Sequence, residues 1–420
     1  MKLGCKLSIV FMFVSAAWQS TNCWSKEPLP RWWRGNLHTH SLWSDGDDFP
    51  EMIGDWYRQQ GYNFLALSDH NTLSEGSRWM PVKTLVDRAD EFALLKYRDR
   101  FGDAWVETKG TPTSDDYAVR LKPLSEFRAL LESRGEFIMI QSEEISDKAE
   151  GKPVHINAAN IAEAIQPSGG ETVREVMQNN LRSILEHEKL HGLEVLPHLN
   201  HPNFGYAVTA EDLAAVIAEQ FFEVYNGHPV VNHLGDKDHA SVERIWDLVN
   251  AIRLTELNAP PIMGIATDDS HEYHGKPGAR PGRGWVMVRS RYLTPEHLIR
   301  AMKRGDFYAS SGVTLDDVRF DEANRRLSLA IRPEPNTTYR TEFVATFAVN
   351  DSQHTADHDK LPDRVGRVVA TVEGSAPSYP MTGNELYVRA VVTSSLPPRD
   401  ASFKDQKQQA WTQPVGWKTK

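Results

Sequence analysis

Histidine and carboxylate side chains recur in short, closely spaced groups along this chain. The first group lies in the stretch NLHTHSLWSDG, residues 36 to 46, which contains His38, His40 and Asp45. Residues i and i+2 of a β-strand point to the same face, about 7 Å apart, so His38 and His40 can reach one ion. Imidazole nitrogens and carboxylate oxygens bind divalent metals, and this group therefore indicates part of a metal site.

Similar side chains occur in other apolar runs that are typical of buried strands. These runs are 61–70, 136–144, 153–160, 193–202, 221–227 and 261–271. Together with the first group they supply nine candidate metal ligands, namely His38, His40, Asp45, His70, Glu144, His155, His201, Asp269 and His271. The carboxyl ends of parallel strands meet at one mouth of a barrel, so we expect these side chains to lie together. Nine ligands are too many for one ion and predict two to three divalent ions.

The ligand types also limit the identity of the metal. The chain has only two cysteines, Cys5 and Cys23, and both precede the predicted fold. Sulfur ligands are therefore not expected. A set of nitrogen and oxygen ligands suits zinc, manganese or iron, and the sequence does not choose among them.

The elements that must position these residues follow a strand–helix rhythm. Helical spacing of apolar residues at 171–191 and 240–254 alternates with the strands, which predicts an α/β fold with a parallel sheet closed into a barrel. After residue 312, period-two patterns in RRLSLAIRP, EFVATFAVN and ELYVRAVVT predict a small antiparallel β domain, a sandwich. The predicted organisation is a leader at 1–24, a metal-binding barrel at 25–312 with a helical insertion at 75–122, and the β domain at 313–420.

The start of the chain and its charge restrict its location and partners. Lys2 and Lys6, the apolar run 7–14 and the alanines that follow are typical of a secretory signal, with a membrane anchor as the competing interpretation. We expect a periplasmic or secreted protein with no transmembrane segment after signal removal. The formal net charge of −10 argues against binding of long nucleic acid.

Six motifs in order resemble the polymerase-and-histidinol-phosphatase (PHP) superfamily of metal-dependent phosphoesterases. They are HTHSLWSDG, ALSDHNT, SEEI, HINA, NHP and TDDSH, and the resemblance spans residues 33–312. The segments GDFYASSG and QAWTQPVGW are similar to its secreted branch, which includes carbaryl-hydrolase-like proteins. This resemblance implies a distorted (β/α)7 barrel with up to three metals.

The resemblance also implies how the ligands divide among the ions. His38, His40, Glu144 and Asp269 would hold the first ion, Glu144, His155 and His201 the second, and Asp45, His70 and His271 the third. Three neighbours, Glu143, His198 and Asp268, compete with this assignment. Glu144 is preferred because Ile145 follows it, His201 because Pro202 follows it, and Asp269 because it keeps the D-x-H spacing.

Further polar residues near the strand ends are candidates for supporting roles. Asp69 and Asn200 are expected to orient metal ligands. In FFEVYNGH, the residues Glu223, Asn226 and His228 could line the substrate pocket, although Asn226 could equally cap a helix. Two arginines, Arg280 and Arg283, could clamp a phosphate or lie in a solvated turn.

These residues predict a hydrolase of phosphate esters in class EC 3.1, a phosphatase or phosphodiesterase. A hydroxide bridging the metals would be the nucleophile, with Asp269, Glu144 and His201 as catalytic residues. The expected substrate is a small-molecule phosphate ester or a short nucleotide, bound by Arg280, Arg283 and His228. The leaving-group acid is unassigned between His198 and His228. One alternative is a carbamate, amide or carboxylic ester hydrolase on the same metals, and another is an envelope or glycan binding protein with a structural metal site.

Overall fold

A computed structural model of the chain describes residues 27–348 and 364–418. The predicted leader at 1–24 lies outside the described residues. A search of the described ranges for a helix that could cross a membrane finds none.

The chain between residues 31 and 267 supplies seven strands of one large sheet. They are β1 (Arg31–Asn36), β2 (Phe64–Leu67), β6 (Ile138–Ala149), β7 (Lys152–Ala159), β8 (Leu196–Leu199), β9 (Phe221–Asn226) and β10 (Met263–Thr267). Their order in the sheet is β10-β9-β8-β7-β6-β2-β1. All six strands predicted after the first motif are therefore present, although β6 continues five residues past Glu144 instead of ending there.

The sheet is mixed, so the prediction that it is parallel throughout is wrong. β1, β2 and β6 run parallel, as do β8, β9 and β10. Strand β7 runs antiparallel to both β6 and β8. Only Glu150 and Gly151, both with positive φ, connect β6 to β7. A two-residue turn of this kind makes a hairpin and leaves no room for a crossover helix.

The two ends of this strand series approach each other beyond the strands themselves. A single parallel bridge between Thr39 and Ser270 joins the segments that follow β1 and β10. No ladder pairs β1 with β10 in the described part of the chain. The closed (β/α)7 barrel therefore stays a prediction.

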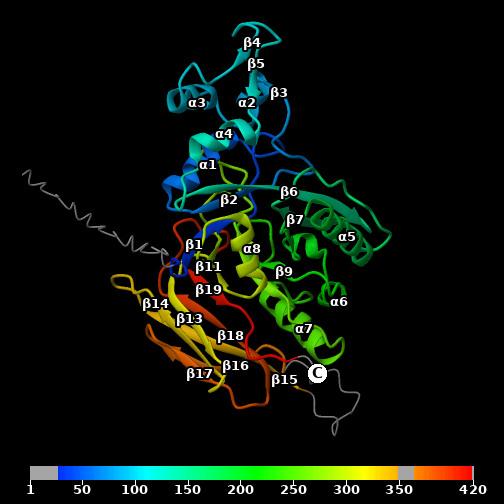
Figure 1. Cartoon of the computed structure of the whole chain (residues 1–420), viewed down its shortest axis with the longest axis vertical. Coiled ribbons are helices and arrows are strands. Elements are labelled where there is room, and N and C mark those ends of the chain that lie inside the picture. The colour runs from blue at the N-terminus through cyan, green and yellow to red at the C-terminus, as the bar shows by residue number, and fades with distance from the viewer. Residues whose placement is uncertain (1–26, 349–363, 419–420) are drawn as a thin grey trace, which may run out of the picture.

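Helices cover the outside of these strands (Figure 1). They are α1 (Pro50–Gln59), α4 (Leu124–Leu131), α5 (Val173–His191), α6 (Ala210–Ala215), α7 (Val242–Thr255) and α8 (Pro295–Lys303). The helices predicted at 171–191 and 240–254 are confirmed by α5 and α7. Side chains fix where they begin: Thr172 and Glu175 form a capping box at α5, and Ser241 caps α7.

Two apolar cores hold the helices and strands together. Val176, Leu181 and Ile184 of α5 pack with Trp246 and Val249 of α7 against the outer face of the sheet. A second cluster fills the inner face and contains Phe64, Ile140, Phe221, Leu298 and Met302, the last two from α8. Apolar side chains of the strands and helices thus form continuous clusters that fix the strands in place.

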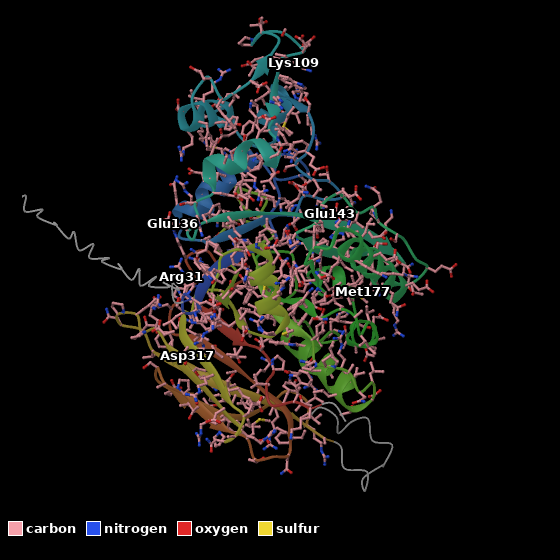
Figure 2. The ribbon with its side chains drawn as sticks, in the orientation of Figure 1. Arg31, Lys109, Glu136, Glu143, Met177 and Asp317 are labelled. Carbon is pink, nitrogen blue, oxygen red and sulfur yellow. The ribbon has the colours of Figure 1, made fainter. Side chains whose placement is uncertain are left out.

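The segment predicted as a helical insertion at 75–122 is mixed in structure. It contains the helices α2 (Val82–Arg88) and α3 (Ala93–Phe101) and also a three-stranded antiparallel sheet, β3 (Arg78–Pro81), β5 (Ala118–Leu121) and β4 (Thr108–Lys109). It projects from one end of the molecule, and Figure 2 places Lys109 at that end, opposite Asp317.

The large sheet continues without a break into the C-terminal part. Next to β1 come β11 (Trp285–Ser290), β12 (Phe307–Ser310), β19 (Gln409–Thr412), β18 (Glu385–Ser394), β15 (Tyr339–Phe347) and β16 (Arg367–Glu373), all antiparallel. A second sheet, β13 (Leu315–Asp321), β14 (Arg326–Ile331) and β17 (Ser378–Pro380), packs on it through Leu315, Leu329, Phe343 and Ala390. The alternating patterns after residue 312 thus form two facing antiparallel sheets.

Candidate metal centre

Glu144 lies at the middle of a cluster of imidazole rings. It is fully buried on β6. Its Oε2 lies 3.3 Å from Nε2 of His38, 3.3 Å from Nε2 of His40 and 2.9 Å from Nδ1 of His70. His38 and His40 follow β1 and His70 follows β2, so neighbouring strands bring these rings to one carboxylate oxygen.

The other carboxylate oxygen of Glu144 faces a second pair of histidines. Oε1 lies 2.9 Å from Nδ1 of His155 on β7 and 3.4 Å from Nε2 of His201, which follows β8. The side-chain amide of Asn200 donates a hydrogen bond of 2.7 Å to the same oxygen. Both oxygens of Glu144 therefore contact candidate ligands, as a bridging carboxylate would.

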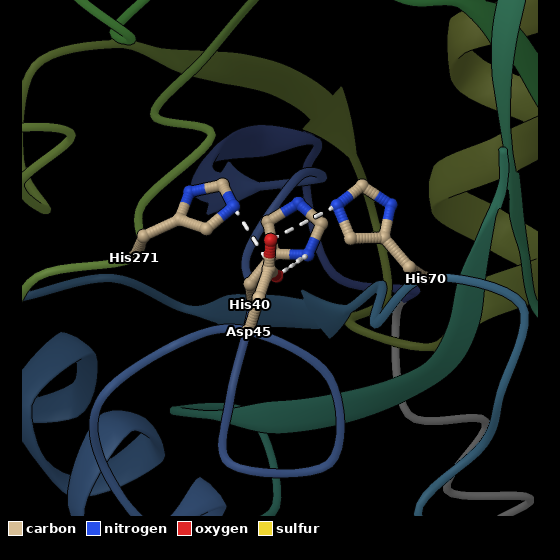
Figure 3. A group of neighbouring side chains, drawn as sticks. All are labelled: His40, Asp45, His70 and His271. Atoms are coloured by element: carbon tan, nitrogen blue, oxygen red, sulfur yellow. Dashed lines mark ion pairs between the residues drawn. The ribbon is translucent and has the colours of Figure 1, made fainter. Parts of the chain in front are cut away.

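The third group surrounds Asp45, in the loop after β1 (Figure 3). Its Oδ1 lies 3.5 Å from Nδ1 of His40 and 3.4 Å from Nε2 of His271, and its Oδ2 lies 3.4 Å from Nε2 of His70. Hydrogen bonds to Asp45 from His271 and His70 oppose the effect of burial and hold the pKa of this carboxyl well below its ordinary value. These four side chains lie close enough to share one metal ion.

Asp269 completes the arrangement from the end of β10. Its Oδ1 lies 3.2 Å from Nε2 of both His38 and His40 and 3.7 Å from Nδ1 of His271. Its backbone has a φ of 49°, a left-handed conformation that is rare for aspartate. The structure thus brings all nine predicted ligands into one cluster.

The chemistry of the donor set fits a cation. His38 donates from Nδ1 to Glu223 Oε1 at 2.7 Å, so the lone pair of the neutral ring is on Nε2. That atom lies 3.1 Å from Nε2 of His40 and close to oxygens of Glu144 and Asp269. Moreover, Glu144 Oε2 is buried and accepts no hydrogen bond from any described residue. Buried acceptor atoms that face one another without a hydrogen-bond donor raise the free energy of the folded chain, unless a proton or a metal ion lies among them.

The electrostatic environment also favours positive charge here. Burial opposes an imidazolium at His38, but Asp269, Glu144 and Glu223 outweigh it and raise the pKa of His38 well above its ordinary value. Burial likewise opposes ionisation of Glu144, but His38, His70 and His155 lower the pKa of that carboxyl well below its ordinary value. A divalent cation can replace the bound protons in such a field.

Two of the three competing residues face away from the cluster, whereas His198 lies close enough to His38 and Glu223 to share an ion with them. The carboxylate of Glu143 accepts a hydrogen bond of 2.5 Å from the backbone N–H of Ile165, on the opposite face of β6. Asp268 accepts hydrogen bonds from Tyr57 and from the backbone N–H groups of residues 282–284. His198 is buried, and its nearest carboxylate is Glu223 at 3.8 Å.

Several polar residues hold the candidate ligands in place. Asn200 contacts Glu144 as described, and Asp69 accepts hydrogen bonds from the backbone N–H groups of Ser41 and Ser44 in the loop that carries Asp45. Asn226 donates to Asp269 Oδ2 at 3.0 Å and does not cap a helix. Fixing ligands in this way is a regular property of metal sites.

Glu223 does not line the pocket as predicted, because it lies buried beneath the ligands with 1% of its surface exposed. Besides His38, it accepts hydrogen bonds from the backbone N–H of His201 at 2.8 Å, Thr267 Oγ1 at 2.6 Å and Asn226 Nδ2 at 2.8 Å. Sequence reasoning missed this role. The only signal was a carboxylate inside the apolar strand FFEVYN.

A cavity of about 160 Å³ opens onto the cluster. The candidate ligands that line it are Asp45, His70, Glu144, His155, His201, Asp269 and His271, and the other lining residues are Phe204, His228 and Val231. His38 and His40 are fully buried below it. The prediction places His228 correctly at the cavity, whereas Phe204 and Val231 were missed because nothing in their sequence context marks them.

The two arginines predicted to bind phosphate do not line this cavity. Arg280 and Arg283 both form ion pairs with Asp400, and Arg283 also donates to the backbone oxygen of Gly227. Arg283 is buried. Both guanidinium groups are thus committed to holding the C-terminal part against the loop after β10.

Comparison with known proteins gives only distant likenesses. No family model matches the chain, and no curated protein is similar to it. Among solved structures, a two-domain protein from Bacteroides vulgatus described as containing a predicted PHP-like metal-dependent phosphoesterase is 13% identical, with a TM-score of 0.40. The similarity covers 91% of this chain and 95% of that protein.

Two further solved structures are similar over a smaller share of the chain. A protein from Bifidobacterium adolescentis, described as a candidate metal-dependent phosphoesterase, is 13% identical with a TM-score of 0.32, over 60% of this chain and 92% of its own. PsfC from Pseudomonas syringae is 11% identical with a TM-score of 0.34, over 65% and 88%.

Proposed function

We propose that this chain is a metal-dependent hydrolase of phosphate esters. The observation that carries the proposal is the contact of one buried carboxylate, Glu144, with five imidazoles below an open cavity. Two to three divalent ions fit the donor set, divided as the resemblance implies. His38, His40, Glu144 and Asp269 would hold one ion, Glu144, His155 and His201 a second, and Asp45, His70 and His271 a third.

When bound, divalent ions supply an activated water at neutral pH and neutralise charge on the phosphoryl oxygens. The chain's own residues orient this centre. Glu223 fixes the ring of His38, and Asn200 and Asn226 fix the carboxylates of Glu144 and Asp269. The role of Glu144, Asp269 and His201 is to hold the ions on which the reaction depends.

His228 is the candidate for donating a hydrogen bond to the leaving group. It lines the cavity, unlike His198. Its Nδ1 accepts a hydrogen bond from the backbone N–H of Val230 at 3.3 Å, so the neutral ring carries its proton on Nε2. Burial lowers the pKa of His228 and keeps it neutral at physiological pH. A neutral imidazole with Nε2–H can donate to an alkoxide that departs from the cavity.

The wider assignment is part of the same proposal. It includes the PHP superfamily with its (β/α)7 barrel, the secreted branch, the division of the chain at residues 24/25 and 312/313, zinc, manganese or iron as the metal, and a periplasmic or secreted location. The ordered motifs of the sequence support the superfamily, and the signal-like start supports the location.

Elemental analysis of the purified protein, together with a panel of phosphomonoesters and phosphodiesters, tests the proposal. We expect two to three equivalents of divalent metal and phosphate-ester turnover that Asp269→Asn abolishes. Asp306→Asn, at an exposed ion pair with Arg304, is the control and should leave turnover unchanged. Absence of bound metal, or full activity of Asp269→Asn with an intact circular dichroism spectrum, would refute it.

One observation favours a second candidate, hydrolysis of a carbamate or carboxylic ester. No lysine or arginine lines the metal cavity within the described residues, and Phe204 and Val231 give it an apolar side. A neutral carbonyl substrate needs no cationic clamp. Aryl carbamates assayed beside aryl phosphates on the same preparation separate the two reactions.

A further inference from the structure

A second groove adjoins the metal cavity. Its volume is about 580 Å³, and His155 and Phe204 line both hollows, so the groove lies beside that cavity. The hairpin of β6 and β7 forms one side of the groove and contributes Ser146, Lys148 and Lys152. Nothing in the reaction described above uses these lysines.

Strand geometry aligns the groove with the metal centre. Glu144, Ser146 and Lys148 alternate along β6 and therefore share one face. Ser146 lies opposite His155 in the register with β7 and contacts Nδ1 of His70 at 2.5 Å. Lys148 lies four positions after Glu144 along the strand, which corresponds to about 13 Å between their Cα atoms.

The ammonium groups in the groove are free to bind an anion. Neither Lys148 nor Lys152 forms an ion pair or hydrogen bond through its side chain with a described residue. The one acidic residue of the groove, Asp147, is already engaged, since its Oδ2 accepts from the backbone N–H of Gly169 and from Asn180 Nδ2. Five other described lysines are paired with carboxylates, namely Lys83, Lys96, Lys122, Lys237 and Lys303, while the remaining described lysines are not.

Phe204 separates the groove from the floor of the metal cavity. It begins the short 3-10 helix η1 (Phe204–Tyr206), and its ring centroid lies 5.2 Å from that of His201. An apolar ring between a cationic groove and a metal cluster suits a carbon skeleton that joins two anionic groups.

We propose that Lys148 and Lys152 bind a second anionic group of the substrate, a phosphate or a carboxylate, while the scissile phosphate occupies the metal cavity. The inference rests on the proposed phosphate-ester hydrolysis and narrows its substrate class to esters with two anionic ends. Phe204 packs against the connecting chain. The two lysines determine specificity and take no part in the chemical step.

Matched substrates test this subsite. Hexane-1,6-diyl bisphosphate and 6-phosphonooxyhexanoate carry a second anion that hexyl phosphate lacks, and they distinguish phosphate from carboxylate as the second group. We expect kcat/KM of the natural chain to favour at least one of the first two over hexyl phosphate by about tenfold. Lys148→Met with Lys152→Met should remove that preference through KM, with turnover of hexyl phosphate changed less than about twofold.

The control is Lys83→Met with Lys109→Met on the insertion, which removes the same charge and should keep the preference. Equal kcat/KM of the natural chain for all three esters would overturn the subsite, as would an equal loss on all three in the groove variant. If none of the esters is turned over, the proposed function fails separately. In that case, calorimetric titration of the metal-loaded protein with hexane-1,6-diyl bisphosphate tests the subsite. Unchanged affinity in the groove variant overturns the subsite, and tenfold weaker binding in that variant supports it.

Discussion

Replacing Glu223 by glutamine should weaken metal binding although Glu223 is not itself a proposed ligand. Its two oxygens accept four hydrogen bonds, from His38 and Thr267 at Oε1 and from His201 and Asn226 at Oε2. A glutamine amide accepts only through its oxygen, so its NH2 group must face two of these donors. Two lost hydrogen bonds at about 1 to 1.5 kcal/mol each give about 2 to 3 kcal/mol.

This loss should appear in metal affinity more than in folding. The metal-free chain can turn the ring of His38 away from the amide, whereas the loaded centre needs the ring in place. The free energy then corresponds to a roughly 30- to 150-fold weaker metal affinity, in the range known for residues that orient ligands. Competition of the metal-free protein with a chromogenic chelator at pH 7 measures it.

Glu219→Gln is the matched control for Glu223→Gln. Glu219 is buried just before β9, but it accepts from the backbone N–H of Phe221 and contacts no candidate ligand. Burial raises the pKa of Glu219 to about 8, so the carboxyl is largely neutral at pH 7 and glutamine resembles it closely. Wild-type metal affinity in Glu223→Gln, with its fold intact by circular dichroism, would refute the reasoning.

Three further predictions concern stability and loop order. Burial raises the pKa of Glu219 to about 8, so the folded chain keeps a proton that the unfolded chain releases near its ordinary pKa of 4.5. This group therefore costs about 2.5 kcal/mol of stability between pH 5 and pH 7, and Glu219→Gln should flatten that dependence in urea titrations. Arg389→Met should lower the free energy of unfolding by about 3 to 5 kcal/mol, because it leaves the carboxylate of Asp247 buried without its bidentate partner. Asp69→Asn should loosen the loop through Ser44 and reduce bound metal by about one equivalent per chain by elemental analysis, since that loop carries a proposed ligand of the third ion.

Each of these has a result that contradicts it. Parallel pH profiles for the natural chain and Glu219→Gln would mean that the carboxyl titrates alike in both states. A loss below 1 kcal/mol in Arg389→Met, as expected for the exposed pair of Arg340 and Glu342, would mean that the buried pair contributes little. Full metal content in Asp69→Asn would show that the loop is ordered without it.

The sequence predicted that the nine candidate side chains lie together, because that proximity depends on local rules. His38 and His40 share a strand-like spacing, and His70 and His271 follow buried apolar runs, so their meeting at one edge follows from strand polarity. The resemblance to known motifs then selected Glu144 over Glu143. The structure supports that choice through the opposite faces that the two side chains occupy on β6.

Other features were not predictable, because they depend on partners far away in sequence. The sequence predicted that Arg283 could clamp a phosphate. In the fold, Arg283 instead pairs with Asp400, which lies 117 residues later in the sequence. The alternation of strands and helices in the sequence also did not predict the reversed direction of β7. The sequence signal for this hairpin turn is Glu150 and Gly151 between two runs of β-branched and apolar residues. The expectation of parallel strands did not take this signal into account.

The position of β19 has a consequence for biosynthesis. Although it comes last among the strands of the described residues, it lies between β12 and β18 and pairs with both. Before residues 409–412 have emerged from the ribosome, the edges of β12 and β18 are unpaired and can pair with other chains. We therefore expect that nascent or truncated chains ending before Gln409 aggregate even though every proposed metal ligand has already been made.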